Sequence, residues 1–552
     1  MATTATRAGS HLRSRTGPSI PSPRDSRCRW VGCAAIISVV VFPVTEMIRV
    51  LAGSAGVILY GDQALIAIAS RRAADFVQLL GPYSRTGFHH PGPTVFYLLA
   101  PFVELASSVG SGLYLGALAI NLVALVATVA IVWRRVGPLA ALWTAAALDL
   151  FALCLGLGTL REPWNPYLVI TPMLLFVVVW AASCTGPSSY GLWALVVGSY
   201  EIQTHIATTP VVLVLLAVMV VRMRLRRLRL SGGGVWAGAA VLVAMWVPTV
   251  VELFRNRPNN LQEIWDFFTS SHQATGWGEL GRVAASVLTV VPFGNHDYTL
   301  SLHRTEPELV LGFLLIAALI VFSVRVVRRH HSSFAARLVE VGLVAGGLGV
   351  LSLAGSDGPV LVYFALWLAS VPVMFLIASG VALFTPGSLA DVPTRAVIAP
   401  VLTGAIIVSG LATGVGFALP PVDHTIGSGP WPAQDAGSAQ GRHRTVQDTA
   451  ELDRASLAAL VLGERSVRFV IGSESDWPYA AGVVLYLEEH GVDVTVSPTS
   501  WEFYFGPNQA PANKPAGEFG LYPAGSPAGA APGGRVIAKV DGTELTLRQL
   551  NR

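Results

Sequence analysis

The stretch VGCAAIISVVVFPVTEMIRVL, residues 31–51, decides the fold class. A helix needs about 20 mostly apolar residues to cross a bilayer, and this run is long enough. A secretory signal is the alternative, because Leu51-Ala52-Gly53-Ser54-Ala55 weakly resembles a cleavage site. The run is long for a signal core, so we interpret it as a first membrane helix that is retained.

Apolar runs of this kind recur through most of the chain. Of its 552 residues, 53% are hydrophobic and only 13% are charged, whereas about 25% is usual in soluble domains. The sequence predicts an all-α polytopic membrane protein with about eleven transmembrane helices and additional juxtamembrane helices. The predicted spans are 31–52, 112–133, 138–158, 167–183, 189–202, 207–222, 234–254, 307–325, 335–354, 359–383 and 396–418.

Three clusters of arginine define the predicted orientation, since basic loops favour the cytoplasmic side of a membrane. Eleven spans with the N-terminus inside place all three clusters in the cytoplasm and the C-terminal region outside. The apolar segment Pro93–Val109 would reverse this arrangement if it crossed, so we interpret it as a helix lying on the outer surface. The clusters are Arg134/Arg135, Arg222–Arg229 and Arg325–Arg329.

The chain divides into four predicted parts. Residues 1–29 form a disordered cytoplasmic tail, 30–419 the transmembrane domain, 420–445 a linker and 446–552 a small extracytoplasmic α/β domain. None of the four cysteines lies in that last domain, so no disulfide framework is expected there. Within it we expect strands at 467–472 and 492–497, a helix at 476–490, and a loose stretch rich in Pro, Gly and Ala at 506–534.

Asp62 is the sharpest candidate for chemistry. It follows the first apolar run in Leu59-Tyr60-Gly61-Asp62-Gln63-Ala64, and we expect it to close the first membrane helix at the outer rim. There a carboxylate can meet both a water-borne acceptor and a lipid-anchored donor, which is the access that a general base needs. A helix cap or an interfacial charge is the simpler interpretation, because Asp favours helix N-termini.

The segment from Tyr83 to Pro93 packs Arg85, His89 and His90 between Gly and Pro residues that stiffen a loop. Arg suits bidentate contact with phosphate, and His can donate to phosphate or relay protons. A structural turn with surface histidines explains the pattern equally well. Adjacent histidines seldom share a metal ion, and the sequence offers no evident third ligand.

A short outer loop carries Arg161, Glu162, Trp164 and Asn165. Trp faces commonly stack on sugars, and Asn can bond to hydroxyl groups. An aromatic-belt Trp beside an Arg–Glu pair is an equally good interpretation.

The next outer-facing helix end is dense in polar residues, with Glu201, Gln203 and His205 in Tyr-Glu-Ile-Gln-Thr-His. Such polarity at the end of an apolar span is costly unless the side chains face a cavity, and we expect a cavity there.

All four polar segments fall on the same predicted side of the membrane, and this convergence predicts a functional site. By contrast, Asp149 inside a span, and Glu46 with Arg49, read as structural contacts between or along helices.

At these residues the chain resembles the GT-C superfamily of membrane glycosyltransferases, near the protein mannosyltransferase and aminoarabinose transferase branch. The matching features are Asp62 after the first span, the turn His89-His90-Pro91-Gly92-Pro93 in a long first outer loop, and the apolar helix Thr94–Val109. In relatives the turn often reads Asn-Lys-Pro-Pro. The strings Gly-Pro-Tyr-Ser-Arg, His-Pro-Gly-Pro, Trp-Asn-Pro and Gln-Thr-His resemble actinobacterial members, and the resemblance covers about residues 31–420.

The resemblance implies an inverting transferase of the plasma membrane that moves a sugar from a polyprenyl-phosphate donor to an envelope glycan, lipid or protein, with Asp62 as base and no nucleic-acid partner. Many relatives have paired acids where this chain has Gln63 after Asp62, which leaves a divalent metal open. We expect donor-phosphate contacts from Arg85, His89, His90, Arg161 and His205, and sugar or acceptor contacts from Glu162, Trp164, Asn165, Glu201 and Gln203.

Two other functions fit the sequence. A transporter or flippase of a lipid-linked precursor would need polar groups near the bilayer midplane and repeated halves, and no repeat is visible. A non-catalytic envelope scaffold would bind glycan through its tail. Trp477, Trp501, Tyr504 and Phe505 are the candidates for such a carbohydrate platform, although core packing is the simpler role.

Overall fold

The computed structural model describes residues 26–52, 58–226, 233–270, 276–294, 304–355, 360–385, 404, 407–408, 449–454, 456, 466–473, 476–506, 517–523, 535–540 and 545–551. The predicted linker 420–445, nearly all of the predicted span 396–418 and most of the tail 1–29 lie outside these residues.

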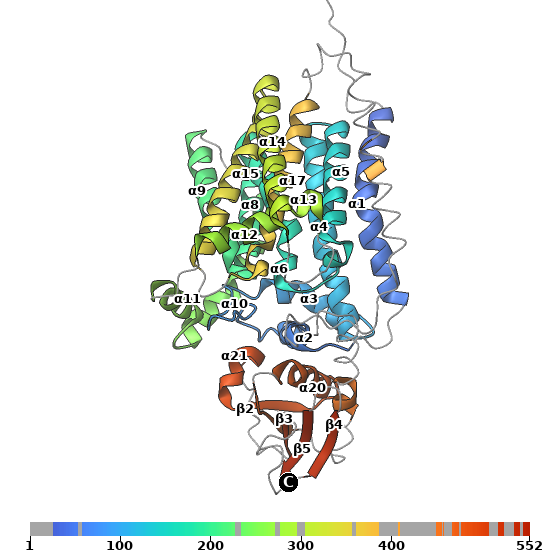
Figure 1. Cartoon of the computed structure of the whole chain (residues 1–552), viewed down its shortest axis with the longest axis vertical. Coiled ribbons are helices and arrows are strands. Elements are labelled where there is room, and N and C mark those ends of the chain that lie inside the picture. Colours follow the sequence, from blue (N-terminus) through green and yellow to red (C-terminus); the bar gives the residue numbers. More distant parts are fainter. Residues whose placement is uncertain are drawn as a thin grey trace, which may run out of the picture.

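A bundle of long apolar helices makes up most of the described chain (Figure 1). Nine helices among the described residues are long and apolar enough to cross a membrane. The multi-pass prediction is therefore confirmed for these helices. The nine are Arg29–Ala52, Val109–Arg135, Pro138–Leu155, Asn165–Thr185, Ile206–Leu225, Gly234–Arg255, Glu306–His330, Ser333–Gly355 and Val362–Leu383.

The helices of the bundle are α1 (Ser26–Ala52), α4 (Val109–Arg135), α5 (Pro138–Leu155), α6 (Asn165–Leu168), α7 (Ile170–Thr185), α8 (Ser189–Thr204), α9 (Thr209–Leu225), α10 (Gly233–Arg255), α14 (Glu306–His330), α15 (Ser333–Ser352), α16 (Val362–Ala365) and α17 (Ser370–Leu383). The eleven predicted spans exceed the nine helices because α8 has only 16 residues and 396–418 is almost wholly undescribed.

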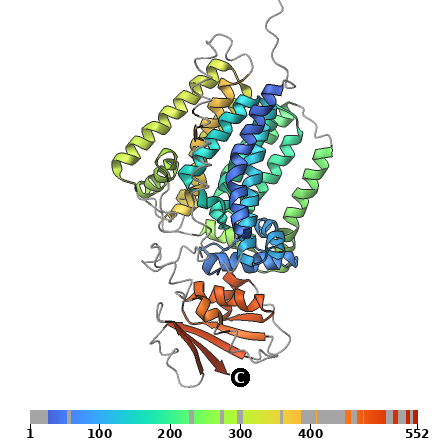
Figure 2. The ribbon, with the colours of Figure 1, turned by 90° about the vertical axis from the view of Figure 1, so that its right-hand side faces the viewer.

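Small residues let the central helices approach closely, as is usual between membrane helices. A Cβ on Gly380 would lie 1.9 Å from Trp143, and one on Gly342 would lie 2.9 Å from Phe375. The most central segment is Asn165–Thr185, whose most apolar window is 94% buried, whereas that of Gly234–Arg255 is only 11% buried and borders the bundle. Figure 2 shows this layering from the side.

The arginine clusters gather at one end of the bundle. Arg135 donates to the Thr185 hydroxyl over 3.3 Å, Arg226 donates to the Cys184 carbonyl, and Arg222 pairs with Glu340 over 2.5 Å. The third cluster ends α14, just before α15 begins at Ser333. This end lies opposite the C-terminal strands (Figure 1).

Short helices cover the other end of the bundle: α2 (Gly61–Ala74), α3 (Thr94–Leu105) and α11 (Asn260–Thr269). Two further short helices, α12 (Trp277–Leu288) and α13 (Val290–Phe293), lie alongside the long helices, where they contact α14 and α5. With 12 residues, α3 is too short to span, which agrees with the predicted surface helix in Pro93–Val109. The prediction that Asp62 closes the first membrane helix is wrong. The helix α1 ends at Ala52, and Asp62 lies in the first turn of α2.

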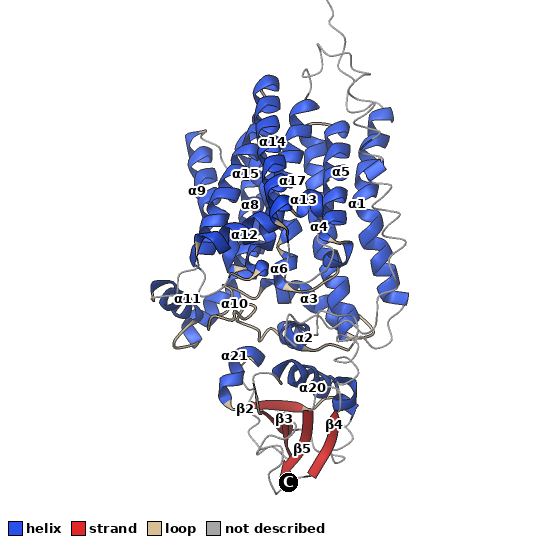
Figure 3. Cartoon of the chain, viewed as in Figure 1, coloured by secondary structure: helices blue, strands red, loops and turns tan. Residues whose placement is uncertain are grey.

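The residues from 466 to 551 form an α/β unit, called here the C-terminal module. Its five-stranded sheet has the order β2-β1-β3-β5-β4, in which β2, β1 and β3 are parallel and β5 and β4 antiparallel. Figure 3 shows the strands only here, with helices between the sheet and α2. The elements are β1 (Ser466–Ile471), α20 (Trp477–Glu489), β2 (Asp493–Ser497), α21 (Glu502–Phe505), β3 (Gly517–Pro523), β4 (Arg535–Val540) and β5 (Leu545–Asn551).

The two predicted strands and the helix between them are confirmed as β1, β2 and α20. The prediction of a loose stretch at 506–534 is wrong for residues 517–523, which form β3 beside β1. Phe519 and Leu521, two residues apart, both point into the core and are fully buried. Their burial favours a strand more than the local Gly and Pro residues oppose one.

Candidate functional site

A cavity of about 840 Å³ lies where the bundle meets the C-terminal module. Its walls come from α2, the loop 77–90, the start of α6, the ends of α8 and α10, the start of α16, and the edge of the C-terminal module. A cavity of this size suits a small ligand, and a few polar groups converge in an otherwise apolar lining.

Asp62 reaches the cavity because the chain turns sharply just before it. Tyr60 is extended, and Gly61 adopts φ +56°, a left-handed conformation that glycine tolerates best. The turn places the carboxylate in the first turn of α2, where the partial positive charge of a helix N-terminus favours an anion. The side chain is only 4% exposed.

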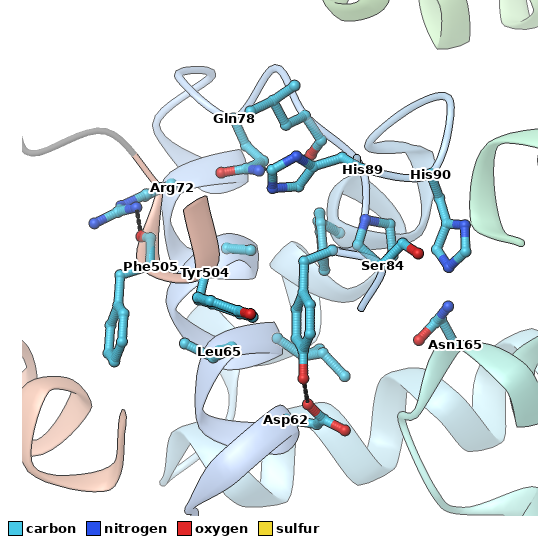
Figure 4. A pocket seen from close by; sticks show the side chains of 18 of the residues that line it. Asp62, Leu65, Arg72, Gln78, Ser84, His89, His90, Asn165, Tyr504 and Phe505 are labelled. Atoms are coloured by element: carbon cyan, nitrogen blue, oxygen red, sulfur yellow. Dashed lines mark hydrogen bonds between the residues drawn. The ribbon is translucent and has the colours of Figure 1, made fainter. Parts of the chain in front are cut away.

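Three side chains hold the Asp62 carboxylate. The Tyr83 hydroxyl donates to Oδ1 (Figure 4), the Trp164 indole N–H donates to the same carboxylate, and the Arg85 guanidinium acts on it electrostatically. Burial dominates these effects and raises the pKa of Asp62 to about 6, although all three partners lower it. The carboxyl group is therefore mostly ionised at neutral pH and is a stronger base than an exposed Asp.

The loop 81–90 is a tight, hairpin-like turn that carries Arg85, His89 and His90. The Ser84 amide donates to the Phe88 carbonyl and the His90 amide to the Pro82 carbonyl, each over 2.8 Å. Gly81 permits this packing, because a Cβ there would lie 2.4 Å from the His90 carbonyl oxygen.

Asn260, at the start of α11, fixes this loop from outside. Its side-chain oxygen accepts from the His89 amide over 2.8 Å, and its side-chain nitrogen donates to the His89 carbonyl over 2.9 Å. The loop backbone is thus held on both sides, which positions its side chains against the cavity.

The three histidines line the cavity as neutral rings. Burial lowers the pKa of His89 and that of His205 to about 4, and it lowers the pKa of His90 well below its usual value. His90 Nδ1 accepts from the Ile206 amide, so its proton is carried on Nε2. The His90 and His205 rings stack with centroids 4.9 Å apart. These rings can donate hydrogen bonds without adding positive charge.

Of the predicted site residues, the structure brings seven to the cavity wall: Asp62, Arg85, His89, His90, Trp164, Asn165 and His205. His90 and the Asn165 amide face each other there (Figure 4).

Four predicted site residues do not line the cavity. Arg161 pairs with the buried Glu46 over 3.2 Å, and Glu46 also pairs with Arg49 over 2.8 Å. Glu162 accepts from the Gln63 side chain over 2.8 Å.

Gln203 accepts from the Thr94 hydroxyl over 2.5 Å, and Glu201 is fully buried within the bundle. Neither residue lines this cavity, whereas His205 of the same predicted cluster does.

Sequence reasoning missed several lining residues. Tyr83 was not predicted as a site residue, although it lies close to Arg85 in the sequence. No sequence pattern around Arg72, Arg255 or Tyr363 indicated that they line the cavity. The aromatic residues Trp477, Trp501, Tyr504 and Phe505 were considered for a separate platform, but they line this same cavity.

Within the described residues, no group of three or more His, Cys, Asp or Glu side chains is arranged to hold a metal ion. Many relatives have paired acids, so the resemblance suggests a second carboxylate beside Asp62. Glu162 is a candidate for it, but its carboxylate accepts a hydrogen bond from the Gln63 side chain.

The helical bundle, the surface helices and the α/β module together have the fold of the solved ArnT structures. The chain is similar to ArnT from Cupriavidus metallidurans bound to undecaprenyl phosphate, with a TM-score of 0.56 and 14% identity over 94% of this chain and 97% of that one. The apo state of the same ArnT matches with a TM-score of 0.53 and 16% identity, over 94% and 98% of the two chains.

The oligosaccharyltransferase of Archaeoglobus fulgidus in the apo form matches more loosely, with a TM-score of 0.37 and 12% identity over 82% of this chain and 64% of that one. No protein-family model matches the chain, and no curated protein matches its sequence.

Proposed function

We propose that the chain transfers a sugar from a polyprenyl-phosphate donor to a hydroxyl of an envelope glycan, lipid or protein, with Asp62 as the catalytic base. The observation that carries this proposal is the buried Asp62 carboxylate, held by Tyr83 and Trp164 beside Arg85 in a cavity at the end of the membrane bundle. A base at that place reaches a lipid-linked donor and a water-borne acceptor together.

The reaction is a single displacement at the anomeric carbon of the sugar. The acceptor oxygen attacks that carbon from the face opposite the phosphate, its proton passes to Asp62, and the bond to the phosphate oxygen breaks. Polyprenyl phosphate leaves, and the anomeric configuration inverts. Phosphate is already a good leaving group, so the protein mainly has to orient the acceptor and stabilise the charge of the phosphate.

Arg85 and Arg255 are the proposed partners of the donor phosphate. Arg85 acts on both Asp62 and Tyr363, and Arg255 is exposed at the end of α10 on the cavity wall. Two cations beside the leaving group favour the developing charge. The solved ArnT structure with bound undecaprenyl phosphate supports a polyprenyl carrier for a chain of similar fold.

We also propose that the cavity faces the outside of the cell membrane. The arginine clusters lie at the opposite end of the bundle, and basic loops favour the cytoplasm. Under this proposal the N-terminus is cytoplasmic and the C-terminal module extracytoplasmic.

Asp62→Asn tests the function. In a deletion strain, we expect mass spectrometry to reveal an accumulated polyprenyl-phosphate sugar and an envelope component that lacks one sugar. The wild-type gene should restore both, whereas Asp62→Asn should reduce transfer by about 10²–10⁴-fold, the usual contribution of a general base. Asp75→Asn is the control, because Asp75 is exposed at the C-terminal end of the same helix. Full restoration by Asp62→Asn would contradict the proposal.

A further inference from the structure

The cavity has two chemically different walls. The charged groups come from the membrane bundle, its surface helices and its loops: Asp62, Arg72, Arg85 and Arg255. The wall from the C-terminal module consists of Trp477, Trp501, Tyr504, Phe505 and Gly506, none of which carries a charge.

Two rings of the aromatic wall stack on each other. The rings of Trp477 and Tyr504 are nearly parallel, with an interplanar angle of 16° and centroids 6.1 Å apart. Trp501 packs against Tyr504 with centroids 5.5 Å apart and an interplanar angle of 45°. These rings give the wall an apolar surface, which suits a ring-shaped ligand better than a charged group.

Tyr83 connects this wall to the base. Its ring packs edge-on against Tyr504 at 5.0 Å and against Trp477 at 6.2 Å, and its hydroxyl donates to Asp62. A ligand resting on the aromatic wall therefore lies within one side chain of the catalytic carboxylate.

Trp477, Trp501 and Phe505 belong to the same buried core as the apolar side chains of the sheet. They also line the cavity, as does the half-buried Tyr504. The wall also offers little to a peptide backbone, because the Phe503 carbonyl bonds to His89 and the Phe505 carbonyl to Arg72.

We infer that the acceptor is an uncharged glycan whose terminal sugar stacks on Trp477 and Tyr504 and presents a hydroxyl to Asp62. This inference rests on the proposed function and narrows its acceptor to a carbohydrate. The apolar face of a sugar ring matches the aromatic wall, and its hydroxyl groups match the polar rim formed by Tyr83 and Asp62. The donor phosphate keeps the arginine side of the cavity.

Saturation-transfer NMR on the full chain in lipid nanodiscs tests the inference without requiring turnover. The probes are a panel of neutral oligosaccharides, with a phosphorylated disaccharide and a polar peptide of similar mass as comparisons. We expect neutral oligosaccharides to bind to the wild type, and Trp477→Ala to weaken binding by about tenfold, the equivalent of one aromatic contact. Trp477→Phe should restore most of the affinity.

Two further variants complete the test. Tyr486→Ala is the matched control, because Tyr486 lies on the same helix but outside the cavity wall. Tyr504→Leu removes an aromatic face while keeping side-chain bulk, in case Trp477→Ala unfolds the module. Equal binding by the wild type and both wall variants would overturn the inference, as would binding of the peptide or the phosphorylated probe alone.

Asp62→Asn separates the two proposals. If it retains transfer in cells while oligosaccharide binding still depends on Trp477, the base is misassigned and the glycan subsite stands. If it loses transfer while oligosaccharides bind independently of Trp477, the function stands and the glycan subsite fails.

Discussion

At the scale of single residues, the proposed role of Asp62 as a base and its burial have opposite requirements. A base must be ionised to accept a proton, yet burial makes the ionised form costly and raises its pKa from 3.8 to about 6. The bonds from Tyr83 and Trp164 recover part of that cost. The carboxylate is therefore reactive because it is poorly solvated, and the protein gives up some stability to keep it there.

The pH dependence of transfer follows from this pKa. As pH falls through about 6, Asp62 becomes protonated, so the rate should fall about tenfold for each pH unit below that value. Initial rates with purified enzyme between pH 4.5 and 8 would measure the profile. An unchanged rate down to pH 5 would contradict the role of Asp62.

The folding stability should also depend on pH, in the direction that this pKa shift sets. The folded pKa lies above the unfolded one, so the favourable contribution is present at low pH and lost as pH rises through about 6. Asp62→Asn should thus raise the Tm by a few degrees at pH 8 and by less at pH 4.5, where much of the contribution is still present. Thermal unfolding in detergent measures both values, and a lower Tm at pH 8 would contradict the burial cost.

At the scale of elements, the loop 81–90 shows how backbone packing sets side-chain position. The bonds from Asn260 and the close contact at Gly81 hold the backbone of His89 and His90 in one arrangement. Arg85 projects from the same turn toward Asp62. The sequence pattern of Gly and Pro predicted a rigid turn, and the structure supplies the partners that make it rigid.

Gly81→Ala should disturb the site without touching the ligand. A Cβ there would lie 2.4 Å from one carbonyl oxygen and 2.6 Å from another, both in the backbone, so the loop must move. Overpacking of this kind typically costs about 1–3 kcal/mol, and we expect a lower Tm with a severalfold loss of transfer. Gly281→Ala in α12, where nothing lies within 4 Å of the added Cβ, is the control. Equal activity of the two variants would contradict the positioning role.

Local sequence predicted some of the site and missed the rest for identifiable reasons. Asp62 and Arg85 lie in segments that stand out in the sequence, because polar residues there are flanked by Gly and Pro. Tyr363 and Trp477 reach the cavity only through contacts between distant parts of the chain, which no short pattern reports. Arg161 illustrates the reverse error, because its partner Glu46 lies 115 positions away and neutralises the cation that sequence reasoning assigned to phosphate.

At the scale of the whole molecule, the C-terminal module is fastened to the bundle by polar contacts around the cavity. Arg72 on α2 donates to the Phe505 carbonyl and lies 3.6 Å from the Glu488 carboxylate on α20. His89 Nε2 donates to the Phe503 carbonyl over 2.9 Å, and the His89 and Phe503 rings pack in a tilted arrangement with centroids 4.5 Å apart. The aromatic wall is thereby held opposite the charged one.

Arg72→Ala should loosen this attachment. The substitution removes the cation that binds both the Phe505 carbonyl and the Glu488 carboxylate, so amide hydrogen exchange across α20 and α21 should rise several-fold while the bundle helices keep their protection. Mass-spectrometric exchange on the full chain would measure this. Arg454→Ala is the control, because Arg454 is exposed and donates to the Ala450 carbonyl four residues earlier. Unchanged exchange in Arg72→Ala would show that other contacts suffice.

The hydrogen bond between His89 and Phe503 joins positions 414 residues apart, so it can form only late in synthesis. Asp62 is synthesised early in translation, whereas the aromatic residues of the C-terminal module are synthesised near the end. A nascent chain that has already inserted its helices still lacks the part of the cavity wall that the C-terminal module supplies. Under the proposed function, a chain released before the module is made should transfer no sugar.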